Sequence, residues 1–446
     1  MNRNWAVVMC CVTAVAASGP AAAESAVRLP GAAGAFPYAA GQVIGQQEAE
    51  ALRDWLPAPF WAERRFFFHA DMQMEIGPAQ RDYGPPPVYT EATARNRGKA
   101  RLGADSSLAG YESGQPFPMA EIDCKGDPGA GAKIIWNFVH RWQGFGAKSR
   151  FRYSYIDRGE VLPLHYEGET AAWILKHRPE PQYRETGGDV FKGEQRFQVV
   201  GFDVEKPIQA AGTRTLTFRY EQSYAPLDTA IPEDTWLYAR QVRRVRKVSQ
   251  SQRSSAVAGT DFTFDDLFSF SGLPLQYAWR CLGEVQLLAP MNTTKLGFPY
   301  EAKTADFGPS ELSYANDRWE LRDAVRIEMV PKGDDHPYSR KEIWIDRQTL
   351  QPLYSAAYDQ AGALWKIITH NHRWSEDDLG GIEARQWYPG WEGVPEPRDL
   401  RVVSDAIVNV QTGTGNRLEF WESHGTPPTL RSLSRFTDVQ RLRRGR

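Results

Sequence analysis

Cysteine and the common catalytic signatures are scarce in this sequence. The 446 residues contain 4 cysteines and 8 histidines. We find no Cys-x-x-Cys pair, no His-Glu-x-x-His and no Gly-x-Ser-x-Gly, which are frequent markers of redox, zinc-protease and serine-hydrolase chemistry. The sequence therefore predicts no metal site and no cofactor.

An excess of positive charge is also missing. Lys and Arg number 53 and Asp and Glu number 55, so the formal net charge is −2. Nucleic-acid binding depends on neutralising phosphates with a basic surface. We therefore expect no nucleic-acid partner.

Long uncharged runs are absent beyond the N-terminus. The first residues, MNRNWAVVMCCVTAVAASGPAAA, place Arg3 before a short apolar run that ends in small residues. This is the layout of a secretory signal peptide. We expect residues 1–23 to be a signal peptide, cleavage before Glu24, and no transmembrane segment in the mature chain.

The mature chain would keep only Cys124 and Cys281. A pair of cysteines in an oxidising compartment is more often a disulfide than a metal site. Two free thiols remain the alternative, because sequence alone does not show that the two residues are close.

Several segments alternate between apolar and polar residues, as half-buried strands do. Examples are RFRYSYID at 150–157, TRTLTFRYEQ at 213–222 and AVRIEMV at 324–330. The segment KEIWIDRQTLQPLYSAAYDQAGALWKIITH, residues 341–370, predicts a meander of three strands joined by two polar turns. Strands of this kind form an antiparallel sheet whose apolar face must be covered.

Few segments have a helical pattern. DPGAGAKIIWNFVHRW, from Asp127, offers an N-cap, Pro128 at the first helical position and an apolar stripe. Two further candidates lie near 46–56 and from about Tyr89. We expect an α+β fold, mainly antiparallel β, in which a large curved sheet forms an incomplete barrel around a few helices, as a single domain over residues 24–446.

Three blocks of the chain resemble a large family of exported bacterial proteins, domain-of-unknown-function family 1329. They are GYESGQPFPMAEIDCKGDPGAGAKIIWNFVHRWQG at 110–144, with its G-x-PFP and W-N-x-x-x-R-x-x-G patterns, then residues 237–248 leading to 262–284, and residues 336–367. The block EIDCKGDPGAG departs from the family pattern, and so does the start before Tyr89. The meander at 341–370 is in turn similar to that of the periplasmic lipoprotein carrier and acceptor proteins.

The resemblance implies a fold and a function. The carrier proteins have an incomplete β-barrel closed by helices, and the space between holds acyl chains. It implies a periplasmic carrier or chaperone for an apolar or lipid-like molecule. It also implies partners, namely a resistance-nodulation-division type transporter and an outer-membrane protein.

Aromatic and aliphatic residues of the alternating strands are candidates for the cavity lining, with a packed core as the alternative. The seven candidates are Phe151, Tyr153, Phe218, Tyr220, Trp279, Ile327 and Trp365. The Pro116, Phe117 and Pro118 loop is a candidate gate, and a rigid turn is its alternative.

Arg240, Arg243, Arg244 and Arg246 form a basic run in which both strand faces carry charge. Such a run suits an exposed sheet edge, where cations discourage aggregation, or a surface that meets anionic head groups or an acidic partner.

Two other functions stay open. An exported hydrolase of apolar substrates could use Asp335 and His336 in the GDDHPY loop, although a solvated hairpin tip explains that loop as well. His370 and His372 would share a strand face and are expected to be a surface pair rather than metal ligands. A scaffold without ligand is the third function.

Overall fold

The computed structural model describes residues 34–157, 160–225, 228–240, 243–248, 253–293, 307–377, 397–425 and 427–444. The expected signal peptide lies outside them. One sheet of 15 strands runs through these ranges, and a small two-stranded sheet joins β3 (Arg101–Leu102) to β4 (Leu108–Ala109). All strand pairs are antiparallel except β2 with β12.

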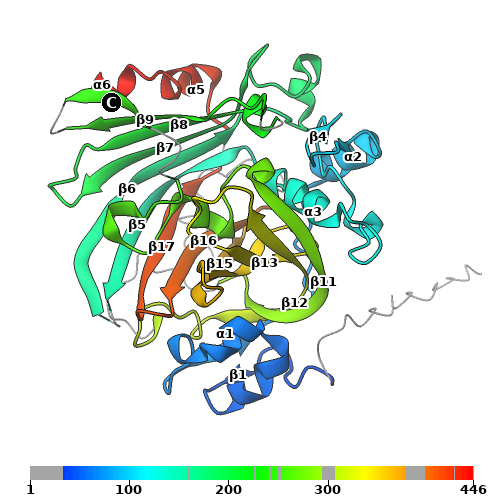
Figure 1. The fold of residues 1–446 in the computed structure, drawn as a ribbon, viewed down its shortest axis with the longest axis vertical. Coiled ribbons are helices and arrows are strands. Elements are labelled where there is room, and N and C mark those ends of the chain that lie inside the picture. Colours follow the sequence, from blue (N-terminus) through cyan, green and yellow to red (C-terminus); the bar gives the residue numbers. More distant parts are fainter. Residues whose placement is uncertain are drawn as a thin grey trace, which may run out of the picture.

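The large sheet follows the chain order over most of its width (Figure 1). In sheet order its strands are β1 (Val43–Ile44), β2 (Met74–Ile76), β12 (Arg318–Pro331), β13 (Arg340–Asp346), β14 (Pro352–Tyr358), β15 (Leu364–Trp374), β16 (Leu400–Asn409), β17 (Thr414–His424), β5 (Gly146–Asp157), β6 (Glu160–Ile174), β7 (Arg196–Lys206), β8 (Arg214–Tyr220), β9 (Asp234–Ala239) and β10 (Arg244–Val248), while β11 (Tyr277–Pro290) pairs with β12.

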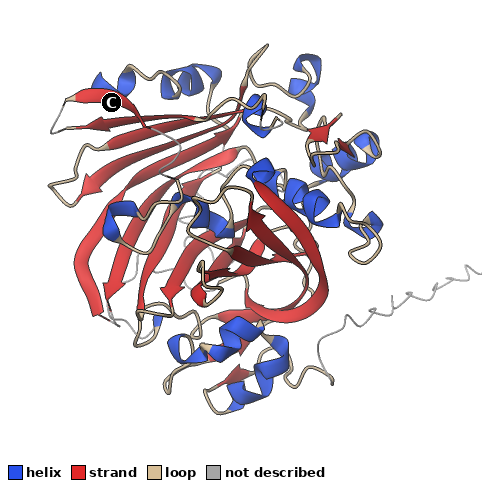
Figure 2. Cartoon of the chain, in the orientation of Figure 1, coloured by secondary structure: helices blue, strands red, loops and turns tan. Residues whose placement is uncertain are grey.

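The helices are few and short, as Figure 2 shows. The α-helices are α1 (Ala58–Ala62), α2 (Pro87–Asn96), α3 (Ala130–Val139), α5 (Leu430–Phe436) and α6 (Arg441–Arg444). The 3₁₀ helices are η1 (Glu48–Trp55), η2 (Arg64–Phe66), η3 (Met119–Glu121), η4 (Pro181–Thr186), η5 (Glu221–Tyr224), η7 (Val257–Gly259), η8 (Phe264–Ser269) and η9 (Pro274–Gln276). None of the helices in the described ranges is long and apolar enough to cross a membrane.

The sheet is open, because its end strands β1 and β10 pair with β2 and β9 and not with each other. An open antiparallel sheet with a few helices confirms the expected fold class of an incomplete barrel. The sheet curves around α3 and the segment 253–276, and we call the side that faces them the inner face (Figure 1).

Both faces of the sheet are covered. On the inner face, Ile134 and Phe138 of α3 pack against Ile327 and Ile343, and Phe262 packs against Ile368 and its neighbours. On the outer face, the N-terminal helices η1 and α1 cover β14 to β16, and the C-terminal helices α5 and α6 cover β6 to β9. Each helix layer buries apolar side chains, which is the main source of stability of such a layered fold.

Helix α3 confirms the expected helix, which begins two residues later than predicted. Asp127 lies before the helix, where its Oδ1 accepts a hydrogen bond from the Gly129 amide at 2.8 Å and its Oδ2 accepts one from Lys133 at 2.7 Å. In the apolar stripe of the helix, Ile134, Ile135 and Phe138 are buried and Val139 is half-buried. Within the candidate 46–56, Glu48–Trp55 form the 3₁₀ helix η1 rather than an α-helix.

The predicted meander is confirmed as β13, β14 and β15. Asp346 closes the first strand, and its Oδ1 accepts the Thr349 amide at 2.7 Å. Asp359 closes the second strand, and its Oδ1 accepts the Ala363 amide at 2.9 Å. Short acidic side chains at these turns satisfy amides that leave the strand ladder.

Candidate functional site

Two adjoining cavities lie between the inner face of the sheet and the segment 253–272. The larger has a volume of about 540 Å³ and the smaller about 190 Å³. The residues that border both are Gln198, Val200, Phe202, Arg219, Leu267 and Ser271, so the two lie side by side. The larger volume is in the range of pockets that hold small organic ligands.

Strands β7, β8 and β9 form one wall of the larger cavity. Because side chains alternate between faces, Thr215 and Thr217 of β8 point into the cavity while the residues between them point outward. The apolar part of the lining consists of Val200, Phe202, Leu237, Val248, Val257, Phe264 and Leu267. These aliphatic and aromatic side chains favour an apolar ligand, and they stand beside the charged lining residues Arg219, Glu233 and Arg253.

The opposite wall is the segment 253–272, which buried ion pairs hold against the sheet. Asp266 is fully buried, and its carboxylate accepts hydrogen bonds from Lys341 at 2.8 Å and from Lys366 at 3.2 Å. Tyr338 donates a third hydrogen bond at 2.7 Å. Burial opposes the charge of Asp266, but the two lysines outweigh it and lower the pKa of this carboxyl.

A second ion network crosses the larger cavity at its floor. Arg219 of β8 pairs with Glu233 before β9, and Arg253 donates to Glu233 at 2.7 Å and to Asp265 at 2.9 Å. Arg219 also donates to the Ser271 carbonyl at 2.7 Å. Burial disfavours the charge of Glu233, but Arg219 and Arg253 outweigh burial and lower its pKa. This network joins the sheet to the segment that covers it.

The smaller cavity begins where α3 ends. Arg141 lines it together with Gln351, Asp399 and Arg401. Asp399 forms an ion pair with Arg401. Arg141 donates from Nη1 to the Phe138 carbonyl at 2.7 Å and from Nε to Gln351 Oε1 at 3.2 Å. Both acceptors are neutral, so they do not balance the charge of Arg141.

A hydrogen-bonded chain of Ser269, His370 and Asp405 lies behind the cavity wall. Ser269 Oγ is 2.6 Å from His370 Nε2, and His370 Nδ1 is 2.6 Å from Asp405 Oδ1. Ser269 and Phe268 both have positive φ, at 62° and 53°. Ser269 and His370 are 0% exposed, so the chain anchors η8 to β15 and β16 and presents no open nucleophile.

The structure does not bring the seven predicted lining residues into one cavity. Phe218 and Tyr220 point to the outer face, where they pack in the cluster that contains α5 and α6. Trp279, Ile327 and Trp365 belong to the cluster around α3. These five residues therefore belong to packed core, which was the stated alternative.

Phe151 and Tyr153 lie closer to the cavity. Both pack in the apolar cluster on the inner face that also contains Phe262 and Ile368. The Phe151 ring is 5.5 Å from the ring of Phe202, which does line the cavity. Phe151 and Tyr153 therefore lie next to the lining residues but do not line the cavity themselves.

The Pro116, Phe117 and Pro118 segment borders neither cavity. The Phe117 amide donates to Asn137 Oδ1 at 2.9 Å, and the Asn137 side chain donates back to the Phe117 carbonyl at 2.6 Å. This pair of hydrogen bonds clamps the segment to α3. The segment lines a separate pocket of about 620 Å³ together with Leu102 and Lys133. Its role as a gate stays a prediction.

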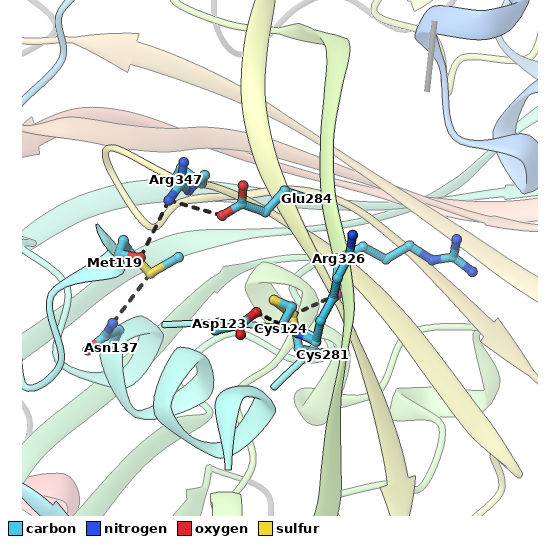
Figure 3. Close-up of a disulfide and its surroundings, with 9 residues drawn as sticks. Met119, Asp123, Cys124, Asn137, Cys281, Glu284, Arg326 and Arg347 are labelled. Atoms are coloured by element: carbon cyan, nitrogen blue, oxygen red, sulfur yellow. Dashed lines mark hydrogen bonds and ion pairs between the residues drawn. A yellow bond between two sulfur atoms is a disulfide. The ribbon is translucent and has the colours of Figure 1, made fainter. Parts of the chain in front are cut away.

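Cys124 and Cys281 form a disulfide with Cα atoms 5.2 Å apart (Figure 3). Cys124 precedes α3, and Cys281 lies in β11, 157 residues later. The bridge ties the loop before α3 to the sheet. Nearby, Arg347 pairs with Glu284 at 3.0 Å and donates to the Met119 carbonyl at 3.4 Å.

The basic run lies at the edge of the sheet, because β10 is the last strand and pairs only with β9. Arg240 and Arg243 precede β10, Arg244 and Arg246 belong to it, and all four are exposed. Cations at an edge strand oppose pairing with another chain.

The histidine prediction was wrong. His370 and His372 are fully buried instead of forming a surface pair, because Ser269 of η8 covers His370, and His372 faces the Pro290 carbonyl of β11. Burial lowers the pKa of His372 to about 3, and the neighbouring His370 adds to this effect. Within the ranges that the structure describes, no group of three metal-ligating side chains was found.

Sequence reasoning missed Arg141, Arg219 and the segment 253–272. For Arg141 a signal was present, because it continues the apolar stripe of α3 as a cation one turn after Phe138. For the covering segment, alternation and helical periodicity give no signal, since it consists of short 3₁₀ turns.

Comparison with protein families gives a match across most of the chain. The family model described as Protein of unknown function (DUF1329) matches residues 43–419. Uncharacterized protein PA3922 of Pseudomonas aeruginosa is 24% identical over 290 residues. The alignment spans 63% of this chain and 58% of that relative.

Two solved structures resemble the chain at low identity. A domain from Vibrio parahaemolyticus, assigned to outer-membrane lipoprotein sorting, is 17% identical with a TM-score of 0.41, covering 66% of this chain and 91% of its own. A DUF1329 family protein from Desulfovibrio piger is 16% identical with a TM-score of 0.41, covering 67% of this chain and 93% of its own.

Proposed function

Because this chain belongs to the DUF1329 family of proteins of unknown function, its own cavity is the best guide to its role, and we propose that it is an exported carrier of an apolar, lipid-like molecule. The carrier would work in the periplasm, as a single domain over residues 24–446 that follows a signal peptide at 1–23. It would pass its ligand between membranes or to an exporter complex.

The observation that carries this proposal is the cavity between sheet and covering segment. Its lining of Val200, Phe202, Leu237 and Leu267 can take alkyl groups out of water. Each buried CH₂ contributes about 0.8 kcal/mol, so an acyl chain of ordinary length would bind with useful affinity. The ligand would enter by partition and leave when the segment 253–272 moves away from the sheet.

The ion pairs that hold this segment against the sheet oppose its movement in the absence of a partner. Arg253 holds Glu233 and Asp265, while Asp266 holds Lys341 and Lys366. Paired charges that separate must be solvated again, so opening requires a partner or a membrane surface. A transporter of the resistance-nodulation-division type and an outer-membrane protein are the partners we propose.

A cavity-filling variant tests the carrier proposal. Val200→Trp would occupy the space that Val200 borders in both cavities. The same substitution at Val43, which is 60% exposed on β1, is the matched control. We expect a fluorescent alkyl probe to bind the wild type and Val43→Trp and to bind Val200→Trp at least tenfold more weakly, on the order of 1.4 kcal/mol. Equal binding by the three proteins would contradict the proposal.

Hydrolysis of an apolar substrate is the second candidate, and the hydrogen-bonded chain of Ser269, His370 and Asp405 favours it. This order of groups is that of a serine hydrolase. A nucleophile must reach the substrate, however, and Ser269 is completely buried. A fluorophosphonate probe that labels Ser269 in the folded protein would establish this function instead.

A further inference from the structure

Arg141 is a buried cation that borders the smaller cavity. It is 8% exposed, and its guanidinium reaches the cavity from the end of α3. Its guanidinium donates to the Phe138 carbonyl and to Gln351 Oε1, which are both uncharged. Among the residues that the structure describes, no carboxylate lies within 4.0 Å of its nitrogen atoms.

The neighbouring charges do not balance it. The charge of Asp399 raises the pKa of Arg141, but Asp399 forms its ion pair with Arg401. Arg219, the remaining cation of the lining, is paired with Glu233. This part of the wall therefore carries one guanidinium, that of Arg141, whose charge no ion pair balances.

A buried charge without a counter-ion is unfavourable, because the protein interior solvates it poorly. Burial lowers the pKa of Arg141 to about 10, and the distant Asp399 compensates only in part. An anion in the cavity would remove this penalty. Arginine is also the side chain best suited to bind a carboxylate or a phosphate through two parallel hydrogen bonds.

The apolar part of the lining begins next to this cation. Phe197, Val200 and Phe202 border the smaller cavity, and Val200 and Phe202 continue into the larger one. A molecule with a charged end at Arg141 would therefore place its other end among Leu237, Val248 and Val257. The unbalanced cation thus lies in the smaller cavity, and the larger cavity adds an apolar lining beside the charge-balanced network of Arg219, Glu233 and Arg253.

We propose that the ligand is an anionic amphiphile, whose carboxylate or phosphate head binds Arg141 and whose alkyl chain lies along Val200 and Phe202. This assignment rests on the proposed carrier function and adds the chemistry of the head group. Arg141 sets the orientation of the ligand in the cavity.

Paired probes test the head group. Binding of a pyrene-labelled fatty acid and of its methyl ester is measured on the delipidated mature protein, because the two differ only in the charge of the head. We expect the wild type to bind the acid at least about tenfold more tightly than the ester. Arg141→Gln should bind the acid no better than the ester, with the ester affinity unchanged. Arg240→Gln, at an exposed arginine, is the control and should behave as the wild type.

The outcomes separate the two proposals. Equal affinity of the wild type for acid and ester would overturn the head-group assignment and leave the carrier function standing. Failure to bind either probe would contradict the carrier function itself. If Arg141→Gln also loses the ester, its fold is damaged, and Arg141→Lys decides, because it keeps the charge and should keep a preference for the acid.

A matched alkyl phosphate distinguishes the source of the anion. Tighter binding of the phosphate than of the fatty acid, lost in Arg141→Gln, would indicate a phospholipid-type head. The reverse order would indicate a free fatty acid. Both results support an anionic head at Arg141.

Discussion

Gly131 of α3 lies directly against the backbone of Arg280 in β11. A Cβ atom at position 131 would be 2.7 Å from the Arg280 nitrogen, which is closer than such atoms come in real structures. The helix that precedes Arg141 is therefore seated on the sheet by a contact that only glycine allows.

Gly131→Ala should displace α3 or strain the sheet, because the contact is with backbone that has little freedom to move. We expect the free energy of unfolding to fall by about 1–3 kcal/mol. Gly333→Ala, where nothing lies within 4 Å, is the control and should leave the stability nearly unchanged. Chemical denaturation measures both, and equal stability of the two variants would show that α3 is not seated in this way.

The Cys124–Cys281 disulfide should contribute substantially to stability, since it closes a long loop of the unfolded chain. Replacing both cysteines by serine should lower the free energy of unfolding by about 2–5 kcal/mol. Thermal melts with and without reductant check this. Two titratable thiols in the purified wild type, with a melt that reductant does not change, would reject the bridge.

Ser269→Ala should destabilise the covering segment. It leaves His370 Nε2 without its hydrogen-bond partner in a buried site, which costs about 1–3 kcal/mol. Ser255→Ala, at an exposed residue of the same segment, should cost little. Hydrogen exchange of residues 261–271 reports the loosening. Unchanged protection in Ser269→Ala would mean that the chain of Ser269, His370 and Asp405 does not anchor the segment.

Glu320 should make stability depend on pH near neutrality. It is buried, its Oε1 accepts a hydrogen bond from Tyr83 at 2.6 Å, and burial raises its pKa from 4.5 to about 7. Between pH 4.5 and about pH 7, Glu320 therefore keeps its proton in the folded state and loses it in the unfolded state. Stability should therefore fall as the pH rises from about 5 to 8.

Glu320→Gln should remove this fall, and Glu233→Gln should not. The pKa of Glu233 is lowered, so its contribution is present above the ordinary value of 4.5 and is lost on acidification. Urea titrations at pH 5 and pH 8 compare the three proteins. A wild type whose stability rises over this interval would show that Glu320 is ionised throughout.

The sequence predicted the sheet better than the side chains that line its cavity. Alternation in the segments 150–157 and 213–222 was correct, and β5 and β8 form there. In β8, however, the aromatic side faces α5 and α6, and the threonine side faces the cavity. Alternation shows that two faces differ, and it does not show what covers each face.

The same limit applies to β15. Lys366 and His370 belong to its polar face, which an isolated strand would expose to water. The structure buries both, because Asp266 and Ser269 arrive from a segment about a hundred residues earlier and satisfy them. Pairings over such distances leave no periodic pattern in the sequence, so the covering segment and its ion pairs could be found only in the fold.

Native mass spectrometry of the mature protein, purified gently from the periplasm, tests the carrier function most directly. We expect a reproducible adduct near one per chain, which organic extraction releases as an anionic amphiphile and which Val200→Trp lacks. A clean apo mass, together with no uptake of fatty acid or alkyl phosphate probes by the same preparation, would contradict the carrier function.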